Sequence, residues 1–193
     1  MPSSTGQLVI ISGPSGVGKS TIVARLVERF AGKLRLSVSA TTRPRRPGEI
    51  DGKHYHFLSD EEFQARREAG EFLEAMEVFG RGHWYGTPID EVRPSLEEGI
   101  WVILEIDVDG ANKVRAEFPQ AMTIFITVDS EEELQRRLRQ RGTDSDEAIG
   151  RRLEVARRER ERAGTYDHLV VNRNVDDAVD QIADILAKEG LRR

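Results

Sequence analysis

The chain has 193 residues, of which 38% are hydrophobic and 33% charged, and its formal net charge is −5 at pH 7. This is enough for one domain with its own core, and the acidic balance argues against sequence-independent binding to nucleic acid or to an anionic membrane. There is no cysteine, which excludes disulfides and thiolate metal sites. Without a spanning apolar run or a secretory signal layout at residues 1–6, we expect a cytoplasmic protein.

Short apolar runs alternate with stretches of helical periodicity, which predicts an α/β protein. Strands are expected at 8–11, 34–38, 72–79, 100–104, 122–126 and 169–171. Two of these runs, 100–104 and 122–126, are continuously apolar, as in strands of a parallel sheet that is covered on both faces. Helices are expected over 22–30, from 59, from 130, over 144–162 and over 175–188. The stretch 41–52 contains two prolines and is expected to be a loop.

The first apolar run leads into a phosphate-binding loop. Its sequence, between a predicted strand and a predicted helix, is Gly13-Pro14-Ser15-Gly16-Val17-Gly18-Lys19-Ser20. Glycines let successive backbone N–H groups face a polyphosphate, and the following helix adds its positive end. We expect Lys19 to reach the β- and γ-phosphates of ATP, Ser20 to ligate Mg²⁺, and Thr21 to complete this site. Because kinases, GTPases and motors share this cradle, it does not identify the acceptor.

Two carboxylates are expected at the carboxyl edge of the sheet, beside the phosphates. Glu105 and Asp107 follow the run 100–104, and alternation along a strand places residues two apart on one face. We therefore expect a joint role near Mg²⁺ or the acceptor, the alternative being a solvated strand end. The sequence does not divide the two roles between them.

An arginine-rich loop follows the second predicted strand. Arg43, Arg45 and Arg46 lie close to Pro44 and Pro47 in an otherwise acidic chain. A guanidinium group donates two parallel hydrogen bonds to a phosphate, and proline lowers the entropy lost when a loop becomes ordered. The loop is therefore predicted to bind an anion, although a solvated basic loop is the alternative interpretation.

Several motifs, in this order along the chain, resemble the guanylate kinase family. They are the P-loop and the segments 37–43, 48–57, 71–74, 85–87, 104–107, 141–143 and 171–172. The resemblance runs from about Gln7 to Lys188, and motifs in register are more specific than one P-loop. It implies the three-layer P-loop NTPase fold with a central parallel sheet, formed by a core of about 1–36, 88–129 and 160–193. An acceptor-binding insert would occupy about 37–87 and a small helical lid about 130–159.

The resemblance also implies the reaction, which is direct transfer of the γ-phosphoryl group of ATP to GMP or dGMP with Mg²⁺ required. The residues implied in GMP binding are Ser39, Arg43, Arg46, Tyr55, Glu74, Tyr85, Thr87, Glu105 and Asp107. Among them, Glu74 and Thr87 would read the guanine. The chemistry agrees, because guanine presents adjacent N1–H and amino donors to a carboxylate, whereas adenine presents an unprotonated N1.

The remaining site residues are implied by the same resemblance. Arg137, Arg141 and Arg152 match lid arginines, which would act with Lys19 as catalytic groups by stabilising the charge on the transferring phosphoryl group. The other arginines near them alternate with glutamates and are expected to form a salt-bridged helix face. Asn172 would lie near the adenine, and Asp107 would help Ser20 to hold Mg²⁺. ATP and GMP are the partners implied, and no obligatory protein partner is evident.

Three other functions are weighed against this one. A related small-molecule kinase would lack a guanine reader such as Glu74. A non-catalytic, guanylate-kinase-like module that binds phosphopeptides typically has a degraded P-loop, whereas Lys19 and Ser20 are intact. A GTP-driven switch would need an Asn-Lys-x-Asp run, which the sequence does not contain. The segment 74–85 is two residues longer than the common family spacing. His54 and His56 could suggest a metal site, but they lack a third ligand.

Overall fold

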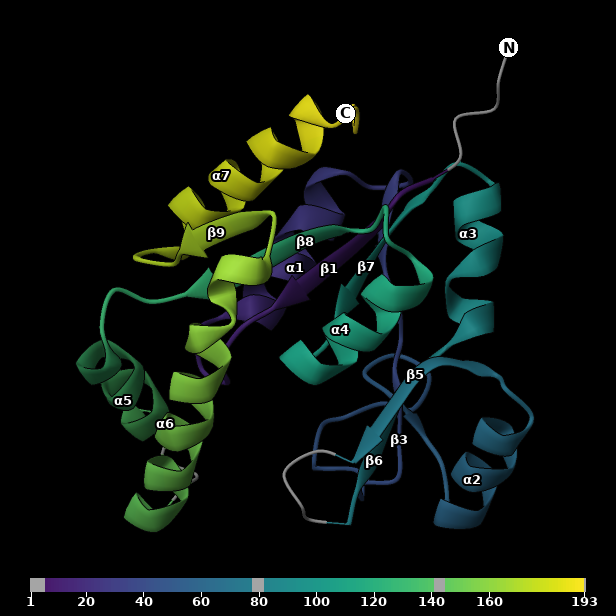
Figure 1. Ribbon diagram of the computed structural model, residues 1–193, viewed down its shortest axis with the longest axis horizontal. Helices are drawn as coiled ribbons and strands as arrows, with labels where there is room; N and C mark the ends of the chain where they lie inside the picture. Colours follow the sequence, from purple (N-terminus) through teal and green to yellow (C-terminus); the bar gives the residue numbers. More distant parts are fainter. Residues whose placement is uncertain (1–5, 78–81, 141–144, 193) are drawn as a thin grey trace.

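The core is a five-stranded sheet with helices on both faces (Figure 1). The computed structural model describes residues 6–77, 82–140 and 145–192. In spatial order the strands are β2 (Leu34–Leu36), β7 (Trp101–Glu105), β1 (Leu8–Ser12), β8 (Met122–Thr127) and β9 (His168–Val171). Every pairing in this sheet is parallel. The predicted α/β class and central parallel sheet are confirmed, and the strand positions agree with the sequence to within a few residues.

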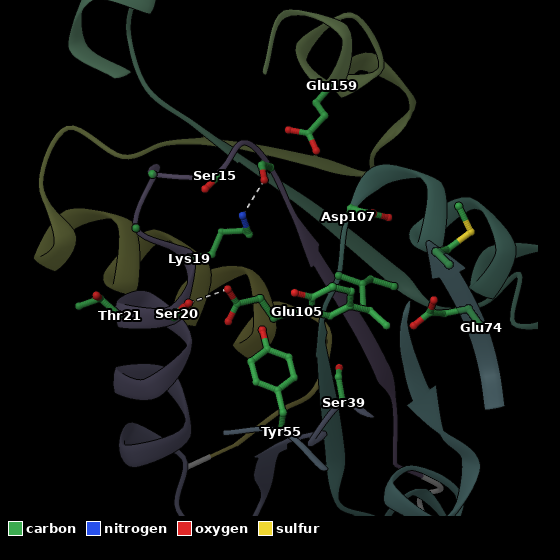
Figure 2. A pocket seen from close by; sticks show the side chains of 16 residues that line it. Ser15, Lys19, Ser20, Thr21, Ser39, Tyr55, Glu74, Glu105, Asp107 and Glu159 are labelled. Atoms are coloured by element: carbon green, nitrogen blue, oxygen red, sulfur yellow. Dashed lines mark hydrogen bonds between the residues drawn. The ribbon is translucent and has the colours of Figure 1, made fainter. Parts of the chain in front are cut away.

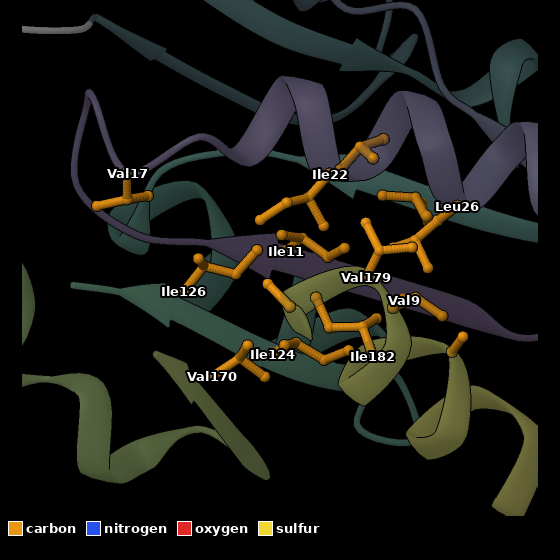
Figure 3. Packing of buried hydrophobic residues seen from close by; sticks show 14 of the residues in the cluster. Val9, Ile11, Val17, Ile22, Leu26, Ile124, Ile126, Val170, Val179 and Ile182 are labelled. Atoms are coloured by element: carbon orange, nitrogen blue, oxygen red, sulfur yellow. The ribbon is translucent and has the colours of Figure 1, made fainter. Parts of the chain in front are cut away.

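Alternating residues of the central strand β1 supply two separate cores. Val9 and Ile11 point to one face, which is covered by α1 (Lys19–Arg29) and α7 (Val175–Lys188). Figure 3 shows this packing, in which β1 meets Ile22 and Leu26 of α1. Leu8 and Ile10 belong to the core on the other face, which α4 (Val108–Glu117) and α3 (Arg93–Glu97) help to cover. Because both faces are covered, the strands consist of continuous apolar runs.

A second, four-stranded sheet is inserted between β2 and β7 of the chain. Its spatial order is β4 (His56–Phe57), β3 (Ala40–Thr41), β6 (Trp84–Pro88) and β5 (Phe72–Glu77). One helix, α2 (Asp60–Glu68), begins at the predicted signal. Ser59 Oγ accepts from the Glu62 backbone N at 3.1 Å, and Glu62 Oε2 accepts from the Ser59 backbone N at 2.9 Å. The sequence did not predict β6, whose residues Gly86 and Pro88 are poor strand formers.

A hydrogen-bonded cluster, called the joint cluster below, links the two sheets through Arg35, Val38, His56 and Glu91. Glu91, in the short helix η1 (Ile89–Glu91), accepts from Arg35 at 2.9 Å and from the backbone N of Val38 at 3.4 Å. Its other oxygen lies 2.8 Å from His56 Nε2. His54 has a different partner, since its Nδ1 accepts from the Ile50 backbone N at 2.9 Å. The two histidines therefore serve separate structural contacts.

A helical pair extends beyond the sheet at the lower left of Figure 1, whereas the insert lies at the lower right. It consists of α5 (Glu131–Gln140) and α6 (Asp146–Glu161), which is followed by η2 (Ala163–Thr165). Ser145 caps α6 by accepting from the Ala148 backbone N at 3.3 Å, which explains a start just after the predicted residue 144. Arg157 joins the two helices by donating to Glu131 at 2.5 Å. Within the ranges that the structure describes, no helix is both long and apolar enough to cross a bilayer.

Candidate active site

A cavity of about 300 Å³ lies where the P-loop, the inserted sheet and α6 meet (Figure 2). Its lining residues are Gly13, Ser15, Gly16, Gly18, Lys19, Ser20, Thr21, Ser39, Tyr55, Glu74, Met76, Tyr85, Glu105, Ile106, Asp107 and Glu159. The parallel strands β1 and β7 both end here. This is the position at which open α/β sheets bind ligands, because loops and helix starts gather at the carboxyl ends of the strands.

The P-loop wraps around one end of the cavity. Gly13 has a φ of 142°, and a Cβ at this position would lie 2.0 Å from the backbone oxygen of Ile126, so only glycine fits. Lys19 Nζ donates to the backbone oxygens of Gly13 at 2.6 Å and Pro14 at 3.2 Å. These contacts hold the ammonium group at the mouth of the loop, above the start of α1, where an anion is stabilised by the helix end.

The two carboxylates at and just beyond the end of β7 have different environments. Glu105 ends the strand and accepts from Ser20 Oγ at 2.7 Å. Asp107 is the N-cap of α4, where its side chain accepts from the Gly110 backbone N at 2.7 Å. The expectation that alternation within one strand orients both residues is therefore wrong, because the strand ends at Glu105. Both still line the cavity, and burial raises the pKa of Asp107.

The far end of the cavity contains a buried carboxyl group. Glu74 on β5 is 7% exposed and lies opposite Thr87 on β6, whose Oγ1 donates to Glu74 Oε1 at 2.8 Å. Burial raises the pKa of Glu74 to about 7, against the opposing effect of the Thr87 hydrogen bond. A Cβ built on Gly110 of α4 would lie 3.3 Å from Glu74 Oε2. The carboxyl group of the insert thus lies directly against a core helix that has no side chain at this point.

The arginine-rich loop is organised by a glutamate. Arg43 donates to Glu49 at 3.0 and 2.8 Å, and the Glu49 side chain also accepts from the Arg46 backbone N at 2.7 Å. Arg43 holds the pKa of Glu49 down to about 2. The Arg43 guanidinium lies 5.5 Å from the centroid of the Tyr55 ring, which lines the cavity with Ser39 and Tyr85. Arg43 and Arg46 themselves do not line the cavity.

The predicted lid residues contact the P-loop or lie outside the cavity. Arg137 donates to Glu133 at 2.7 Å, to the backbone oxygen of Asn172 at 2.9 Å and to that of Val17 at 3.4 Å. The Asn172 side chain is 1% exposed and donates to Val17 at 2.6 Å, so both residues support the loop from behind. Arg152 does not line the cavity. Arg141 lies outside the described residues.

Sequence reasoning missed Glu159, which lines the cavity from α6. The arginines near it were expected to pair with glutamates of the same helix, whereas Arg157 pairs with Glu131 of α5 and Arg162 pairs with Asp109 of α4. Figure 2 shows the Glu159 side chain directed toward the P-loop residues Ser15 and Lys19. The one available signal was its position seven residues after Arg152, which places both on the same side of a helix.

Comparisons with known proteins agree with this arrangement. The family model described as guanylate kinase matches residues 5–189. A guanylate kinase of Rhodopirellula baltica is 52% identical over 182 residues, covering 94% of this chain and 87% of that protein. One from Caldanaerobacter subterraneus subsp. tengcongensis is 47% identical, covering 97% and 89%. The crystal structure of guanylate kinase from Anaplasma phagocytophilum has a TM-score of 0.81 at 33% identity and covers 100% of this chain and 90% of that one.

Proposed function

The chain belongs to the guanylate kinase family, and on that premise we propose that it transfers the γ-phosphoryl group of ATP to GMP or dGMP. The observation that carries the proposal is one cavity with Lys19 of a P-loop at one end and the buried carboxyl group of Glu74 at the other. The first suits a polyphosphate donor and the second suits a base with paired N–H donors. The proposal includes a cytoplasmic location, where both nucleotides are available.

The donor would bind with its phosphates in the P-loop. Lys19 is held at the loop mouth by the Gly13 and Pro14 carbonyls, so it can turn to the β- and γ-phosphates with little rearrangement. Arg137 and Asn172 both donate to the Val17 carbonyl and would keep the loop in shape. We assign Asn172 to the adenine side of this site, next to the loop that it supports.

The acceptor base would bind between Glu74, Thr87 and Asp107. Ionised Glu74 can accept from N1–H and the amino group of guanine, while a third hydrogen bond, from Thr87 to Oε1, orients the carboxylate. Adenine would place a lone pair against this buried carboxylate, so we expect AMP to be rejected by a large factor. The residues assigned to the acceptor contact its base and its phosphate, which GMP and dGMP share, so we include dGMP as an acceptor.

The acceptor phosphate would lie between the base site and the P-loop. Ser39, Tyr55 and Tyr85 line this part of the cavity, and the rings of Tyr55 and Tyr85 are 5.9 Å apart. Arg43 and Arg46 belong to the adjoining loop, where Glu49 holds them in place. We propose that they reach the phosphate when the insert, about 37–87, closes on the core.

The oxygen groups beside the P-loop fit a hard cation such as Mg²⁺. Ser20 Oγ and Glu105 lie 2.7 Å apart, and Asp107 lines the same cavity. Hydroxyl and carboxylate oxygens are the donors that Mg²⁺ prefers, directly or through water. When bound, Mg²⁺ would neutralise negative charge on the donor phosphates. We assign Ser20 and Asp107 to it, and Glu105 would orient the Ser20 hydroxyl.

The proposed transfer is direct and in line, with no covalent enzyme intermediate. The phosphate of GMP is already an anion, so no general base is needed once its repulsion from ATP is reduced. Lys19 would stabilise the moving charge from the core. Arg141 and Arg152 of the lid, about 130–159, would do so from the other side as the lid closes and excludes water. Arg137 would join them by exchanging its hydrogen bond to the Val17 carbonyl for one to the phosphoryl group.

A coupled assay with ATP as donor tests this function across GMP, dGMP, AMP, UMP and CMP. We expect transfer to GMP and dGMP, and at least about a hundredfold lower kcat/KM with AMP. Lys19→Ala should lower kcat by at least about a thousandfold while GMP binding, measured separately, changes little. Faster transfer to a sugar phosphate than to GMP would favour the small-molecule kinase. Tight phosphopeptide binding without any GDP formation would favour the non-catalytic module.

A further inference from the structure

Glu159 has no part in the transfer as proposed above, although it lies in the donor end of the cavity. It is carried by α6 and lines the cavity together with Ser15, Gly16 and Lys19 (Figure 2). It is partly buried, and its carboxyl group, unlike its backbone oxygen, makes no hydrogen bond to another residue in the part of the chain that the structure describes. A carboxyl group is thus directed into a space that suits polyphosphate.

The charges that face Glu159 come from several elements. Lys19 of α1 is a cation across the cavity, whereas Asp107 and Asp109 at the start of α4 are anions. The phenol of Tyr166, after η2, is also coupled to it, while Arg162 pairs with Asp109. Burial raises the pKa of Glu159 to about 7, although Lys19 acts to lower it. Near neutral pH the group therefore exists in both protonation states before any nucleotide binds.

Bound phosphates would change this balance in one direction. They engage Lys19, which weakens its attraction for the Glu159 carboxylate, and they add negative charge on the side that the carboxylate faces. A neutral carboxylic acid instead offers one O–H donor, and an O–H to anionic phosphate hydrogen bond is short and strong. The charges around the cavity would therefore favour the acid form of Glu159 beside phosphate.

We propose that Glu159 is a phosphate-contacting residue that takes up one proton when nucleotide binds and donates it in a hydrogen bond to a phosphate oxygen. The proton comes from the solvent and no covalent bond is made or broken. The inference rests on the proposed donor site, since it requires phosphates in the P-loop. Because α6 also carries Arg152, protonation of Glu159 would lower the negative charge that this helix presents to the donor phosphates.

Isothermal titration calorimetry of ADP and ATP binding, with Mg²⁺ in fixed excess, tests the proposal. Titrations at pH 7.5 in HEPES and in Tris buffer give the number of protons taken up, because the two buffers have different ionisation enthalpies and neither contains phosphate. We expect wild type to take up about half a proton or more in excess of Glu159→Gln. Its Kd should weaken roughly tenfold between pH 6.5 and 8.5, against less than about twofold for the variant. Glu154→Gln, an exposed position on the same helix, is the matched control and should behave as wild type.

The outcomes separate this inference from the proposed function. If wild type binds neither nucleotide, the donor site itself is wrong. If nucleotide binds with equal proton stoichiometry in wild type and Glu159→Gln, the proposed role of Glu159 is wrong while the donor site stands. Proton release that increases with Mg²⁺ concentration and disappears in Glu159→Gln would also overturn it, since the carboxylate would then serve the cation. If Glu159→Gln does not fold, Glu159→Ala replaces it in the same titrations. Absence of proton uptake by wild type would by itself overturn the proposal.

Discussion

Replacing Glu74 by Gln should stabilise the free protein at alkaline pH. The pKa of Glu74 is raised from 4.5 to about 7 because the side chain is buried, so the folded state binds a proton more tightly than the unfolded state. The favourable contribution of the protonated form is therefore complete below pH 4.5 and is lost as the pH rises through 7. Gln carries no charge to bury, and it can still accept from Thr87.

The size of this effect follows from the pKa difference. Each pKa unit corresponds to about 1.4 kcal/mol, so the shift sets an upper limit of roughly 3 kcal/mol on the gain at pH 8, and we expect about 1–3 kcal/mol. Urea unfolding without nucleotide at pH 5 and pH 8 measures it. Other titrating groups are common to both proteins and cancel in the difference. Glu77→Gln, at an exposed position on the same strand, is the control and should show no gain at pH 8.

The same substitution should weaken GMP binding. Its amide would face one guanine donor with an N–H group, and we expect a loss of about 2–4 kcal/mol, or roughly thirtyfold to a thousandfold in Kd. In wild type, affinity for GMP should fall as the pH drops below 7, because guanine requires ionised Glu74. Equal unfolding free energies of the variant and wild type at both pH values would refute the argument that burial of ionised Glu74 destabilises the protein. A GMP affinity within about threefold of wild type would refute the assignment of Glu74 to guanine recognition.

Two other positions give sharp tests. Gly110→Ala would place a methyl group 3.3 Å from Glu74 Oε2 and 3.2 Å from Asp107 Oδ1, so GMP affinity should fall about tenfold while ATP affinity, measured in the same calorimeter, is unchanged. A proportional loss of both affinities would mean that the helix, not the base site, is damaged. Glu91→Gln weakens the joint cluster and should lower the unfolding free energy by about 1–2 kcal/mol and raise KM for GMP more than KM for ATP. Unchanged values in denaturant titration and steady-state kinetics would show that the cluster does not position the insert.

Local signals account for most of the fold. The core strands were predictable because they are buried on both faces, and α7 has the predicted bounds of 175–188 because its helical pattern is long and Asn174 caps it. The P-loop was predictable because its glycines and lysine must follow a strand and begin a helix. For β6 there was no such signal, since its pairing with β5 and β3 compensates for poor strand formers.

The errors within the candidate site concern side-chain direction. Asp107 was interpreted as a strand residue, although Asp before a helical segment is also an N-cap signal, and the chain turns there. The arginines and glutamates that alternate around Glu159 did not indicate where its side chain points, because that depends on where α6 lies relative to the P-loop. In the same way, the sequence identified the arginines of the loop but not that Glu49 would organise them. Such features arise from tertiary placement, which local periodicity does not encode.

The contact between Glu74 and Gly110 joins a residue of the insert to a helix of the core. A guanine bound there would contact both the insert and the core. Only the arrangement in which the insert lies close to the core would therefore bind GMP with full affinity. The apparent Kd for GMP would then equal the intrinsic Kd divided by the fraction of molecules already in that arrangement. Substitutions far from the base that alter this fraction would retune acceptor affinity without changing any atom that the nucleotide contacts.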